Sequence, residues 1–466
     1  MVLLINPPDP KGYISNKDTM GGLGQLYSYE SNIKVPPIDI FHIAAILANF
    51  NIPVKIIDYL IEEYNEKEIV KLLYMVKPKL IGIRVAFPIF DFNLEFAHFL
   101  KKISCEYKVL LFGPYLHFID RTDVEKIQKY GIEYYTGLDL TINFIALVLN
   151  LLNINYQKDL LDKYNANTTE GFNNIPFPKW QLVDYWKYRV PFFKDEPFLP
   201  ILSSKGCIYG CSYCPYVAVQ GYKFINKSAE KIIDEIEFIY KQLGIKNILF
   251  RDPFFTNNIN RVDKICNGII AKNMKIKWVC ETKVESLNEE IIYKMAKAGC
   301  FQINFGIESF NKFALINSKR KIVNVNKLKK IIEYCRKYKI KTFGFFIIGF
   351  PEDDKFQVLN TIAKAINLNL DMTQFTYLIP YPGTPLFQMI KDKGYIIEKN
   401  KINYTSYKPV IKTNFLSISE LKSLGELANF SILFKQQKII PFKISFIKKK
   451  IKYLLKIIFY FLKTLN

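Results

Sequence analysis

Residues 199–215 read LPILSSKGCIYGCSYCP, a short apolar run followed at once by three cysteines. Cys207, Cys211 and Cys214 are spaced so that one loop can bring three thiolates to a common point. Cysteine is the usual protein ligand of iron–sulfur clusters. A site with only three thiolates leaves one iron of a cubane cluster open for the amino and carboxylate groups of another molecule. The stretch therefore predicts a cluster loop directly after a buried strand.

A zinc site or a set of disulfides would account for the three cysteines less well. A structural zinc site normally has four protein ligands, and no histidine or fourth cysteine lies near these three in the sequence. A secreted disulfide scaffold is usually shorter and denser in cysteine than this chain of 466 residues with eight cysteines. The N-terminus, MVLLINPP, lacks the charged segment and long apolar run of a signal peptide. We therefore expect a cytoplasmic protein.

Apolar strands alternate with helices before the cysteine loop. Strands are expected at 2–6, 53–57, 79–85, 108–112 and 132–135, and helices at 38–50, 66–76, 91–104 and 122–130. This alternation predicts a Rossmann-like, doubly wound parallel sheet with helices on both faces over residues 1–150. Such sheets bind ligands beyond the carboxyl ends of their strands, where this chain has Asn6, Asp58 and Gly113. Residues 9–37 are predicted to form a long loop.

A second alternating run follows a predicted linker with one helix at 151–195. Strands are expected at 199–204, 247–251, 276–281, 301–306, 342–348 and 372–379, with helices between them. Six strand–helix units predict a partial (β/α)6 barrel over residues 196–410. Catalytic groups of barrels lie at the carboxyl ends of the strands, and the cysteine loop follows the first strand. Residues 411–466 are predicted to be helical.

The net charge of +22, from 65 basic and 43 acidic residues, raises the question of nucleic acid. Lysine is spread along the chain and no recognition motif accompanies it, so nucleic acid is not an expected partner. The exception is the C-terminal tail, where Lys448, Lys449, Lys450, Lys452, Lys456 and Lys463 alternate with apolar residues. This pattern predicts peripheral contact with the inner face of a membrane. Packing of an amphipathic helix on the barrel accounts for it equally well.

With these features, the chain resembles the radical S-adenosylmethionine (radical SAM) proteins that carry a cobalamin-binding domain. That superfamily includes the class B methylases and the anaerobic cyclases of tetrapyrrole synthesis. The resemblance covers residues 1–400 and rests on the cysteine loop and on stretches 250–256, 306–309, 344–353 and 381–385. It implies a 4Fe-4S cluster on Cys207, Cys211 and Cys214. It also implies that the open iron binds S-adenosylmethionine, which is cleaved to a 5′-deoxyadenosyl radical.

The resemblance further implies which residues contact S-adenosylmethionine, namely Tyr213, Asp252, Glu308, Gly349 and Pro351. Two of these assignments have plainer alternatives. The carboxylate of Glu308 could be a structural group held by a helix N-terminus. Gly349 and Pro351 could belong to an ordinary strand-to-helix turn.

The N-terminal strand ends resemble the cobalamin-binding module of the same superfamily. This implies that Asn6, Asp58 and Gly113 contact cobalamin. The lower-ligand motif Asp-x-His-x-x-Gly is absent, so cobalamin would bind without a histidine on cobalt. The usual Gly-Gly-Pro-His turn is replaced by FGPY at 112–115. The alternative is a domain that only shapes the substrate pocket.

The resemblance implies an enzyme that starts radical chemistry on an organic substrate, with cobalamin-dependent C-methylation as the expected reaction. Radical rearrangement or cyclisation without methyl transfer is the alternative. A protein of another class, a membrane-surface scaffold with an inactive barrel, is disfavoured because all three cysteines are intact. The expected partners are a small-molecule or lipid-like substrate and an external electron donor such as flavodoxin or ferredoxin.

Overall fold

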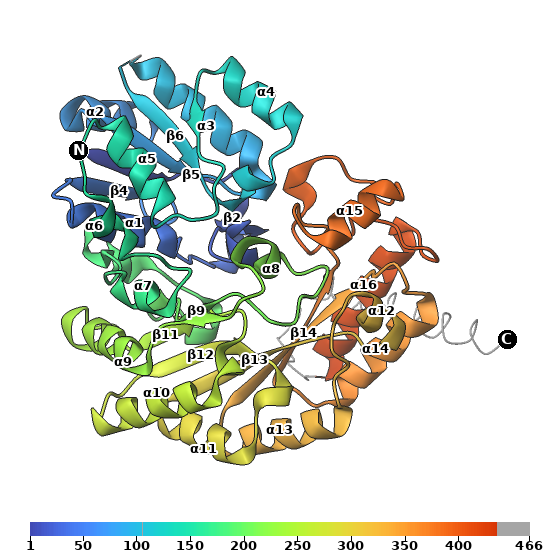
Figure 1. The fold of residues 1–466 in the computed structure, drawn as a ribbon. Helices are drawn as coiled ribbons and strands as arrows, with labels where there is room; N and C mark the ends of the chain where they lie inside the picture. Colours follow the sequence, from blue (N-terminus) through green and yellow to red (C-terminus); the bar gives the residue numbers. More distant parts are fainter. Residues whose placement is uncertain (105, 436–466) are drawn as a thin grey trace, which may run out of the picture.

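Two parallel sheets organise the molecule, one in each half of the view in Figure 1. The computed structural model describes residues 1–104 and 106–435. The N-terminal sheet and its helices lie above, and the sheet that follows the cysteine loop lies below. The predicted α/β class is confirmed.

The N-terminal sheet has five parallel strands in the order β4-β1-β5-β6-β7. These are β1 (Val2–Asn6), β4 (Val54–Asp58), β5 (Leu80–Arg84), β6 (Lys108–Phe112) and β7 (Glu133–Tyr134). Its helices are α1 (Ile38–Ala48), α2 (Glu66–Val76), α3 (Phe90–Ile103), α4 (Arg121–Lys129) and α5 (Asn143–Leu151). The order reverses between β1 and β5, which is where doubly wound sheets open a ligand crevice.

The burial of β1 shows why this sheet forms. All five residues of the strand are buried, and successive side chains enter different cores. Val2 and Leu4 belong to the core that also contains α1, whereas Leu3 and Ile5 pack into the core beneath α2 and α3. Both faces of the sheet are therefore covered, as the continuous apolar runs of the sequence predict.

The prediction of a long loop at residues 9–37 is wrong. The segment forms an antiparallel hairpin of β2 (Tyr13–Asn16) and β3 (Gln25–Ser28), with three glycines in the turn. Ser15 donates hydrogen bonds from its backbone N and its Oγ to the carboxylate of Asp9, which fixes the start of the hairpin. The strands are too short, and the turn too rich in glycine, to show a hydrophobic period in the sequence.

The second sheet has six parallel strands in the order β15-β14-β13-β12-β11-β8. These are β8 (Phe198–Ile201), β11 (Asn247–Phe250), β12 (Lys277–Thr282), β13 (Cys300–Glu308), β14 (Lys341–Ile348) and β15 (Met372–Tyr377). All neighbouring strands in this order are parallel, and among the described residues β8 and β15 form the two edges of the sheet. The result is the predicted open, partial barrel.

Helices cover the outer face of this barrel (Figure 1). They are α9 (Ala229–Glu237), α10 (Ile259–Ala271), α11 (Glu289–Lys297), α12 (Lys312–Asn317), α13 (Val325–Lys337) and α14 (Lys355–Asn367). The cysteine loop is bounded by a small antiparallel pair, β9 (Ser204–Lys205) with β10 (Ile225–Asn226), and by α8 (Pro215–Gln220). After β15 come α15 (Pro385–Asp392) and α16 (Ile418–Lys435).

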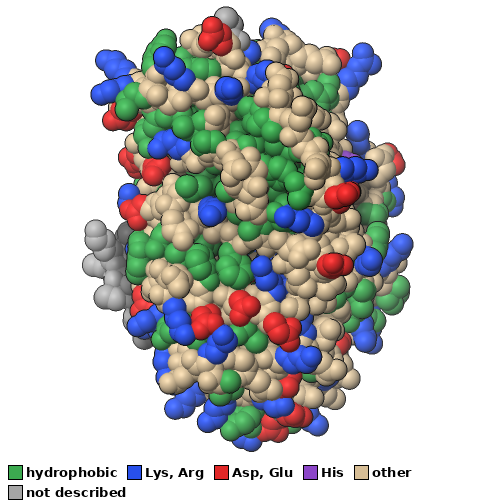
Figure 2. All heavy atoms as spheres, turned by 60° about the vertical axis from the view of Figure 1, so that its left-hand side comes forward, with side chains coloured by type: hydrophobic (Ala, Val, Ile, Leu, Met, Phe, Trp, Pro, Cys, Tyr) green, Lys and Arg blue, Asp and Glu red, His purple; other side chains and the backbone are tan. Residues whose placement is uncertain are grey.

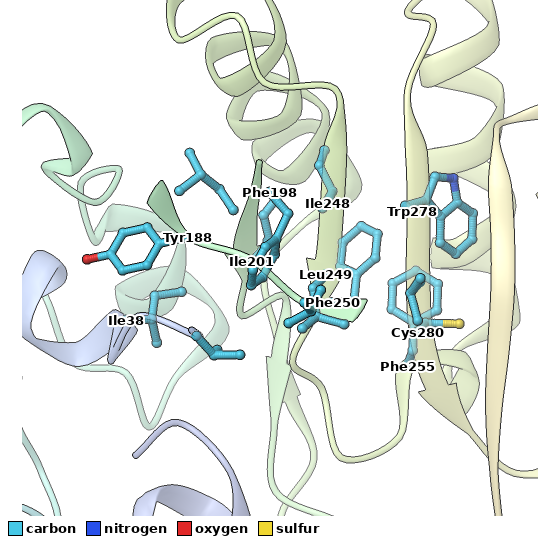
Figure 3. Close-up of a cluster of buried hydrophobic side chains, with 14 of the residues drawn as sticks. Ile38, Tyr188, Phe198, Ile201, Ile248, Leu249, Phe250, Phe255, Trp278 and Cys280 are labelled. Carbon is cyan, nitrogen blue, oxygen red and sulfur yellow. The ribbon is translucent and has the colours of Figure 1, made fainter. Parts of the chain in front are cut away.

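The segment 151–195 is a packed joint rather than the predicted linker with one helix. It contains two short helices, α6 (Lys158–Asp162) and α7 (Thr169–Asn174), and the fully buried side chains of Trp180 and Tyr188. Figure 3 shows Tyr188 above Ile38 of α1 and to the left of Phe198 of β8. Aromatic residues in an irregular segment thus complete a core that both sheets share.

Basic side chains do not gather into one stripe among the described residues on the face drawn in Figure 2, where they alternate with acidic and hydrophobic groups. Across the same described part of the chain, no helix is both long enough and apolar enough to cross a bilayer. The predicted membrane contact of the lysine-rich tail at 448–463 falls outside the described residues and stays a prediction.

A buried ion pair beside the cysteine loop provides a test of the packing. Lys227 Nζ lies 2.8 Å from Glu235 Oε2, and both side chains are fully buried. Lys227→Met should lower the free energy of unfolding by about 3–5 kcal/mol, because it leaves a buried carboxylate without its counter-charge. Adding Glu235→Leu should restore most of that loss. Urea unfolding followed by circular dichroism measures both effects.

The matched control is Lys241→Met. Lys241 Nζ lies 2.6 Å from Glu237 Oε1, but its side chain is 56% exposed. Its loss should cost no more than about 1 kcal/mol. Equal effects of the two substitutions would contradict the assigned role of the buried pair.

Candidate functional site

A cavity of about 580 Å³ lies inside the barrel, along its strands up to their carboxyl ends. Its walls come from distant parts of the chain: the β2–β3 hairpin, the cysteine loop, the barrel strands and the segment after β15. All three predicted cluster ligands, Cys207, Cys211 and Cys214, line it. The structure therefore brings the three cysteines to one wall of one cavity.

Backbone contacts hold the cysteine loop in this place. Gly206 has a φ of +75°, and a Cβ there would stand 2.0 Å from the carbonyl oxygen of Lys223, so only glycine fits. Cys207 N donates to Gly221 O at 3.2 Å, and Cys214 N donates to Cys211 O at 3.0 Å. The three sulfur ligands are thus carried by a loop whose path is fixed.

The thiols are largely shielded from water. Cys207 and Cys211 are each 7% exposed. Burial raises the pKa of Cys211, and it raises the pKa of Cys214 to about 12. Deprotonation of the thiols therefore requires positive charge nearby, as a metal cluster or a cation supplies.

Lys283 supplies one such charge and has no counter-ion of its own. Its Nζ lies 3.2 Å from the centroid of the Tyr209 ring and is buried without a hydrogen-bond partner among the described residues. Burial, with a further contribution from the nearby Arg320, lowers the pKa of Lys283 to about 8, while the three cysteines act in the opposite direction. An unpaired buried cation beside three thiols makes this wall a site for a negatively charged group.

Glu308 and Arg320 provide opposite charges on the same wall. The Arg320 Nη2 atom lies 4.0 Å from Glu308 Oε1, and both residues line the cavity. Burial raises the pKa of Glu308, although Arg320 and Lys283 act to lower it. Glu308 has a φ of +70°, an uncommon backbone conformation for a non-glycine residue. A carboxylate beside two cations is suited to hold a zwitterionic ligand.

Tyr213 also lines the cavity, but the predicted residues Gly349 and Pro351 do not. The backbone N atoms of Gly349 and Phe350 each donate to the Asp353 carboxylate at 3.0 Å, which fixes the turn. The Phe350 ring then packs edge-on against Tyr213, with centroids 5.5 Å apart. The turn supports Tyr213 from behind, and direct contact of Gly349 and Pro351 with a cofactor remains a prediction.

Asp252 lies behind the cavity wall rather than in it. Its carboxylate accepts hydrogen bonds from Ser203 N at 2.8 Å and from the hydroxyls of Ser203 and Ser204 at 2.5 Å. Arg261 Nη2 lies 3.4 Å from the same carboxylate. These contacts give Asp252 the role of positioning the chain where it enters the cysteine loop, and direct cofactor contact remains a prediction.

The three residues predicted at the edge of the N-terminal sheet are enclosed by the chain itself. Asn6 donates to Asp58 at 2.7 Å, and the hydroxyl of Tyr188 donates to the same carboxylate at 2.6 Å. Lys17 Nζ donates to the side-chain oxygen of Asn6 at 2.6 Å. Neither Asn6, Asp58 nor Gly113 lines the cavity.

Arg84 occupies the space beside Gly113. A Cβ on Gly113 would stand 2.4 Å from Arg84 Nη1 and 2.7 Å from the carbonyl oxygen of Val85. Arg84 Nε donates to the Asp39 carboxylate at 2.6 Å, and its Nη2 donates to Gly22 O at 2.8 Å. The buried guanidinium therefore ties the sheet edge to α1 and to the hairpin turn.

Arg251 is a site residue that sequence reasoning missed. It lines the cavity, and its Nε donates to the Asp18 carboxylate at 2.7 Å. Glu281 lies 3.5 Å from its Nη1 on the other side. Arg251 belongs to the stretch 250–256 that the sequence singled out, but its partner Asp18 belongs to the segment predicted as a loop.

Residues 201–380 match the family described as the radical SAM superfamily. These residues form a radical SAM domain. The match begins at the last residue of β8 and extends past β15, so it covers the cysteine loop and nearly the whole barrel.

Curated relatives of the chain include proteins named as methyltransferases. The chain is 25% identical over 414 residues to an "uncharacterized methyltransferase PH0819" of Pyrococcus horikoshii, which covers 87% of this chain and 89% of the relative. It is 27% identical over 203 residues to bacteriochlorophyllide d C-12(1)-methyltransferase of Chlorobaculum tepidum, which covers 43% of this chain and 44% of the relative.

Two solved structures share the fold of both halves. One is the radical SAM methyltransferase TsrM from Kitasatospora setae, solved with cobalamin and a [4Fe-4S] cluster, with a TM-score of 0.63 and 17% identity over 91% of this chain and 84% of that chain. The other is the cobalamin-dependent enzyme OxsB, with a TM-score of 0.64 and 16% identity over 92% of this chain and 65% of that chain. These similarities support the predicted combination of a Rossmann-like domain and a radical SAM barrel.

We expect the protein to assemble an oxygen-sensitive 4Fe-4S cluster when it is reconstituted anaerobically. Cys211→Ala should lose both the bound iron and the broad visible absorbance, because the loop supplies only three thiolate ligands and this substitution removes one of them. The control is Cys335→Ala, which removes a fully buried thiol of α13 in the hydrophobic core. Iron analysis and absorbance measure the result, and an unchanged iron content in Cys211→Ala would refute the ligand assignment.

Proposed function

We propose that this radical SAM enzyme cleaves S-adenosylmethionine reductively and starts radical chemistry that ends in cobalamin-dependent C-methylation of an organic substrate. The observation that carries the proposal is the shared cavity wall of Cys207, Cys211, Cys214 and the unpaired cation of Lys283. The relatives named as methyltransferases support the type of reaction.

The three cysteines suit a cluster better than a single ion. Among the described residues, no three His, Cys, Asp or Glu side chains meet closely enough to bind one metal ion. In a cubane cluster each thiolate binds a different iron atom. The three sulfur ligands of a cluster therefore lie farther apart than the ligands of a single metal ion. When bound, the cluster supplies the single electron that breaks the carbon–sulfur bond of S-adenosylmethionine.

The charged wall beside the cysteines can orient S-adenosylmethionine. Arg320 and Lys283 are placed to pair with its carboxylate, and Glu308 to accept a hydrogen bond from its amino group. Tyr213 offers an aromatic surface, held in place by Phe350. The chain's own residues thus bind and orient the sulfonium donor.

The β2–β3 hairpin shields the cavity from water. Asn16, Gln25 and Tyr27 face the cavity from the hairpin. The buried ion pair of Asp18 with Arg251 fastens the hairpin to the barrel. Exclusion of water protects reactive intermediates from side reactions, which radical chemistry requires of the protein.

The apolar side chains that line the cavity favour an apolar substrate. Its wall includes Phe343 and Phe345 of β14, Met372 of β15, and Phe192 of the packed joint. None of these side chains carries a charge, so the cavity fits a hydrophobic or aromatic small molecule better than a highly charged one. This supports the expectation of a small-molecule or lipid-like substrate.

The cobalamin assignment concerns two parts of the N-terminal half, the hairpin at the cavity and the edge of the sheet. On the cavity side, Asn16, Gln25 and Tyr27 of the hairpin offer polar contacts to a bound corrin. At the sheet edge, Arg84 occupies the space beside Gly113, so a nucleotide tail can enter there only if the guanidinium moves. None of the described residues that line the cavity is a histidine.

The filled sheet edge also supports a second candidate function. If the N-terminal domain only walls the cavity, S-adenosylmethionine cleavage leads to radical rearrangement or cyclisation without methyl transfer. The two functions share the cysteine loop and the charged wall, and they differ only in whether a corrin is bound.

Incubation with S-adenosylmethionine and dithionite should yield 5′-deoxyadenosine, measured by mass spectrometry. Cys207→Ala should yield none. Glu308→Gln should raise the KM for S-adenosylmethionine roughly 10- to 100-fold, because it removes the negative charge that strengthens the hydrogen bond from the amino group. Cys335→Ala is the control and should retain activity. Product formation by Cys207→Ala at the wild-type rate would contradict the proposal.

Arg84→Ser tests the cobalamin assignment. We expect wild-type protein purified with hydroxocobalamin to retain corrin, and Arg84→Ser to retain more, because the substitution empties the space beside Gly113. Arg121→Ser, at a side chain that is 93% exposed, is the control. Corrin absorbance after gel filtration measures binding. If neither the wild type nor Arg84→Ser retains corrin, the N-terminal domain only forms a wall of the cavity. The reaction would then be radical chemistry without methyl transfer.

A further inference from the structure

The cysteine loop has an inner and an outer side, and only the inner side faces the cavity. On the inner side the hairpin turn packs against α8, where a Cβ on Gly21 would stand 3.1 Å from Pro215 O. On the outer side Ile208 is 60% exposed, although it is the direct neighbour of Cys207. Within residues 204–221, all of which the structure describes, Ile208 is the one exposed residue.

Other exposed apolar side chains belong to the segments next to the cysteine loop. Tyr222 is 61% exposed, and its ring lies against Gly210 of the cysteine loop. The loop is joined to the end of α12 by the hydrogen bond from Ser212 N to Ser318 O, 2.9 Å long. In Figure 1 α12 lies beside this loop.

We name this area the loop–α12 surface. It consists of Ile208, Tyr222, Lys223, Lys312, Phe313, Ile316, Lys319 and Lys321, all of which are exposed. Phe313 is 70% exposed and Ile316 60%. Large apolar side chains exposed on two segments that a hydrogen bond joins beside a buried cluster ligand favour an interaction surface.

The charge of this surface is mainly positive, and the carboxylate that lies against α12 is that of Glu352, which accepts a hydrogen bond from Asn317 at 2.8 Å. Residues 205–229 and 309–332 contain no Asp or Glu, although the chain has 43 acidic residues among its 466. The charged residues of both segments are lysines and one arginine, of which Lys227 and Arg320 are buried against Glu235 and Glu308 and add no charge to the surface. Basic side chains next to exposed apolar ones are complementary to an acidic protein surface.

We propose that the loop–α12 surface docks a small acidic one-electron carrier, an iron–sulfur or flavin protein, that reduces this enzyme. The inference rests on the proposed function, because only reductive cleavage of S-adenosylmethionine needs such a donor. Complexes of redox proteins are small and transient, and opposite charges steer their encounter. A ring of lysines around a few apolar contacts has the composition that such a complex uses.

The position of the surface also fits its role. Ile208 and Cys207 are consecutive residues, so their Cα atoms are only about 3.8 Å apart. A carrier seated on Ile208 would stand next to a sulfur ligand without entering the cavity. The reduced carrier loses one electron, and the same electron breaks the carbon–sulfur bond of S-adenosylmethionine to give methionine and a 5′-deoxyadenosyl radical.

The test compares two electron sources in the reconstituted full-length enzyme. One reaction uses dithionite, and the other uses flavodoxin with its reductase and NADPH; 5′-deoxyadenosine is measured in both. The variants are Lys223→Glu/Lys312→Glu and, separately, Phe313→Ser. The control is Lys67→Glu/Lys71→Glu, which makes the same charge change on the exposed face of α2.

At low ionic strength the Lys223→Glu/Lys312→Glu variant should lose roughly tenfold or more of its flavodoxin-supported rate, because steering by opposite charges is removed. Phe313→Ser should lower the same rate with a weaker dependence on salt. All variants should keep the dithionite-supported rate and the iron content of the wild type. The control should keep both rates.

Several outcomes would overturn the proposal. Unchanged flavodoxin-supported rates in both surface variants would do so, as would equal losses with flavodoxin and dithionite. Binding of anionic phospholipid vesicles by wild type but not by the surface variants, without any change in the flavodoxin-supported rate, would assign the surface to a membrane instead.

Direct binding separates this proposal from the proposed function. The affinity of flavodoxin for the reconstituted enzyme, measured by isothermal titration calorimetry, does not require S-adenosylmethionine cleavage. If the wild type makes no 5′-deoxyadenosine with dithionite, the proposed function fails. If it makes 5′-deoxyadenosine with dithionite but binds flavodoxin no better than Lys223→Glu/Lys312→Glu does, the docking surface fails alone.

Discussion

The ion pair of Arg251 with Asp18 fastens the β2–β3 hairpin of the N-terminal half to the barrel beside the cavity. Both side chains are nearly buried, at 6% and 10% exposure. Burial raises the pKa of Asp18 to about 6, while Arg251 acts to lower it. Loss of either partner would leave a buried charge uncompensated, which in proteins costs about 3–5 kcal/mol. The hairpin, the cover of the cavity and the exclusion of water all depend on this contact.

The second feature of the site is its positive charge, and each of its cations has a different environment. Arg251 is neutralised by two carboxylates, Arg320 faces Glu308, and Lys283 has no carboxylate partner among the described residues. A buried lysine without a partner is costly unless a ligand compensates it. Because Lys283 lies beside the three cysteines, the cluster site contributes to the electrostatic balance of the protein as well as to its chemistry.

The N-terminal half shows how one fold can be adapted in detail. Its overall arrangement is shared with TsrM and OxsB at TM-scores of 0.63 and 0.64. Yet the strand edge where doubly wound sheets bind ligands contains Arg84, Lys17 and Tyr188 of the chain itself. Similarity of fold places the domain correctly, but the side chains at the strand ends decide what it binds.

The sequence by itself determined the two sheets, most helix positions and the three cysteines. Buried parallel strands are continuous apolar runs, and the cysteines are close neighbours in one loop, so both features are local. Only the tertiary structure decided the hairpin, the packed joint around Tyr188, the guanidinium beside Gly113 and the pairing of Arg251 with Asp18. The last two residues are 233 positions apart. Contacts at such separations depend on how the sheets pack, which no local pattern of residues encodes.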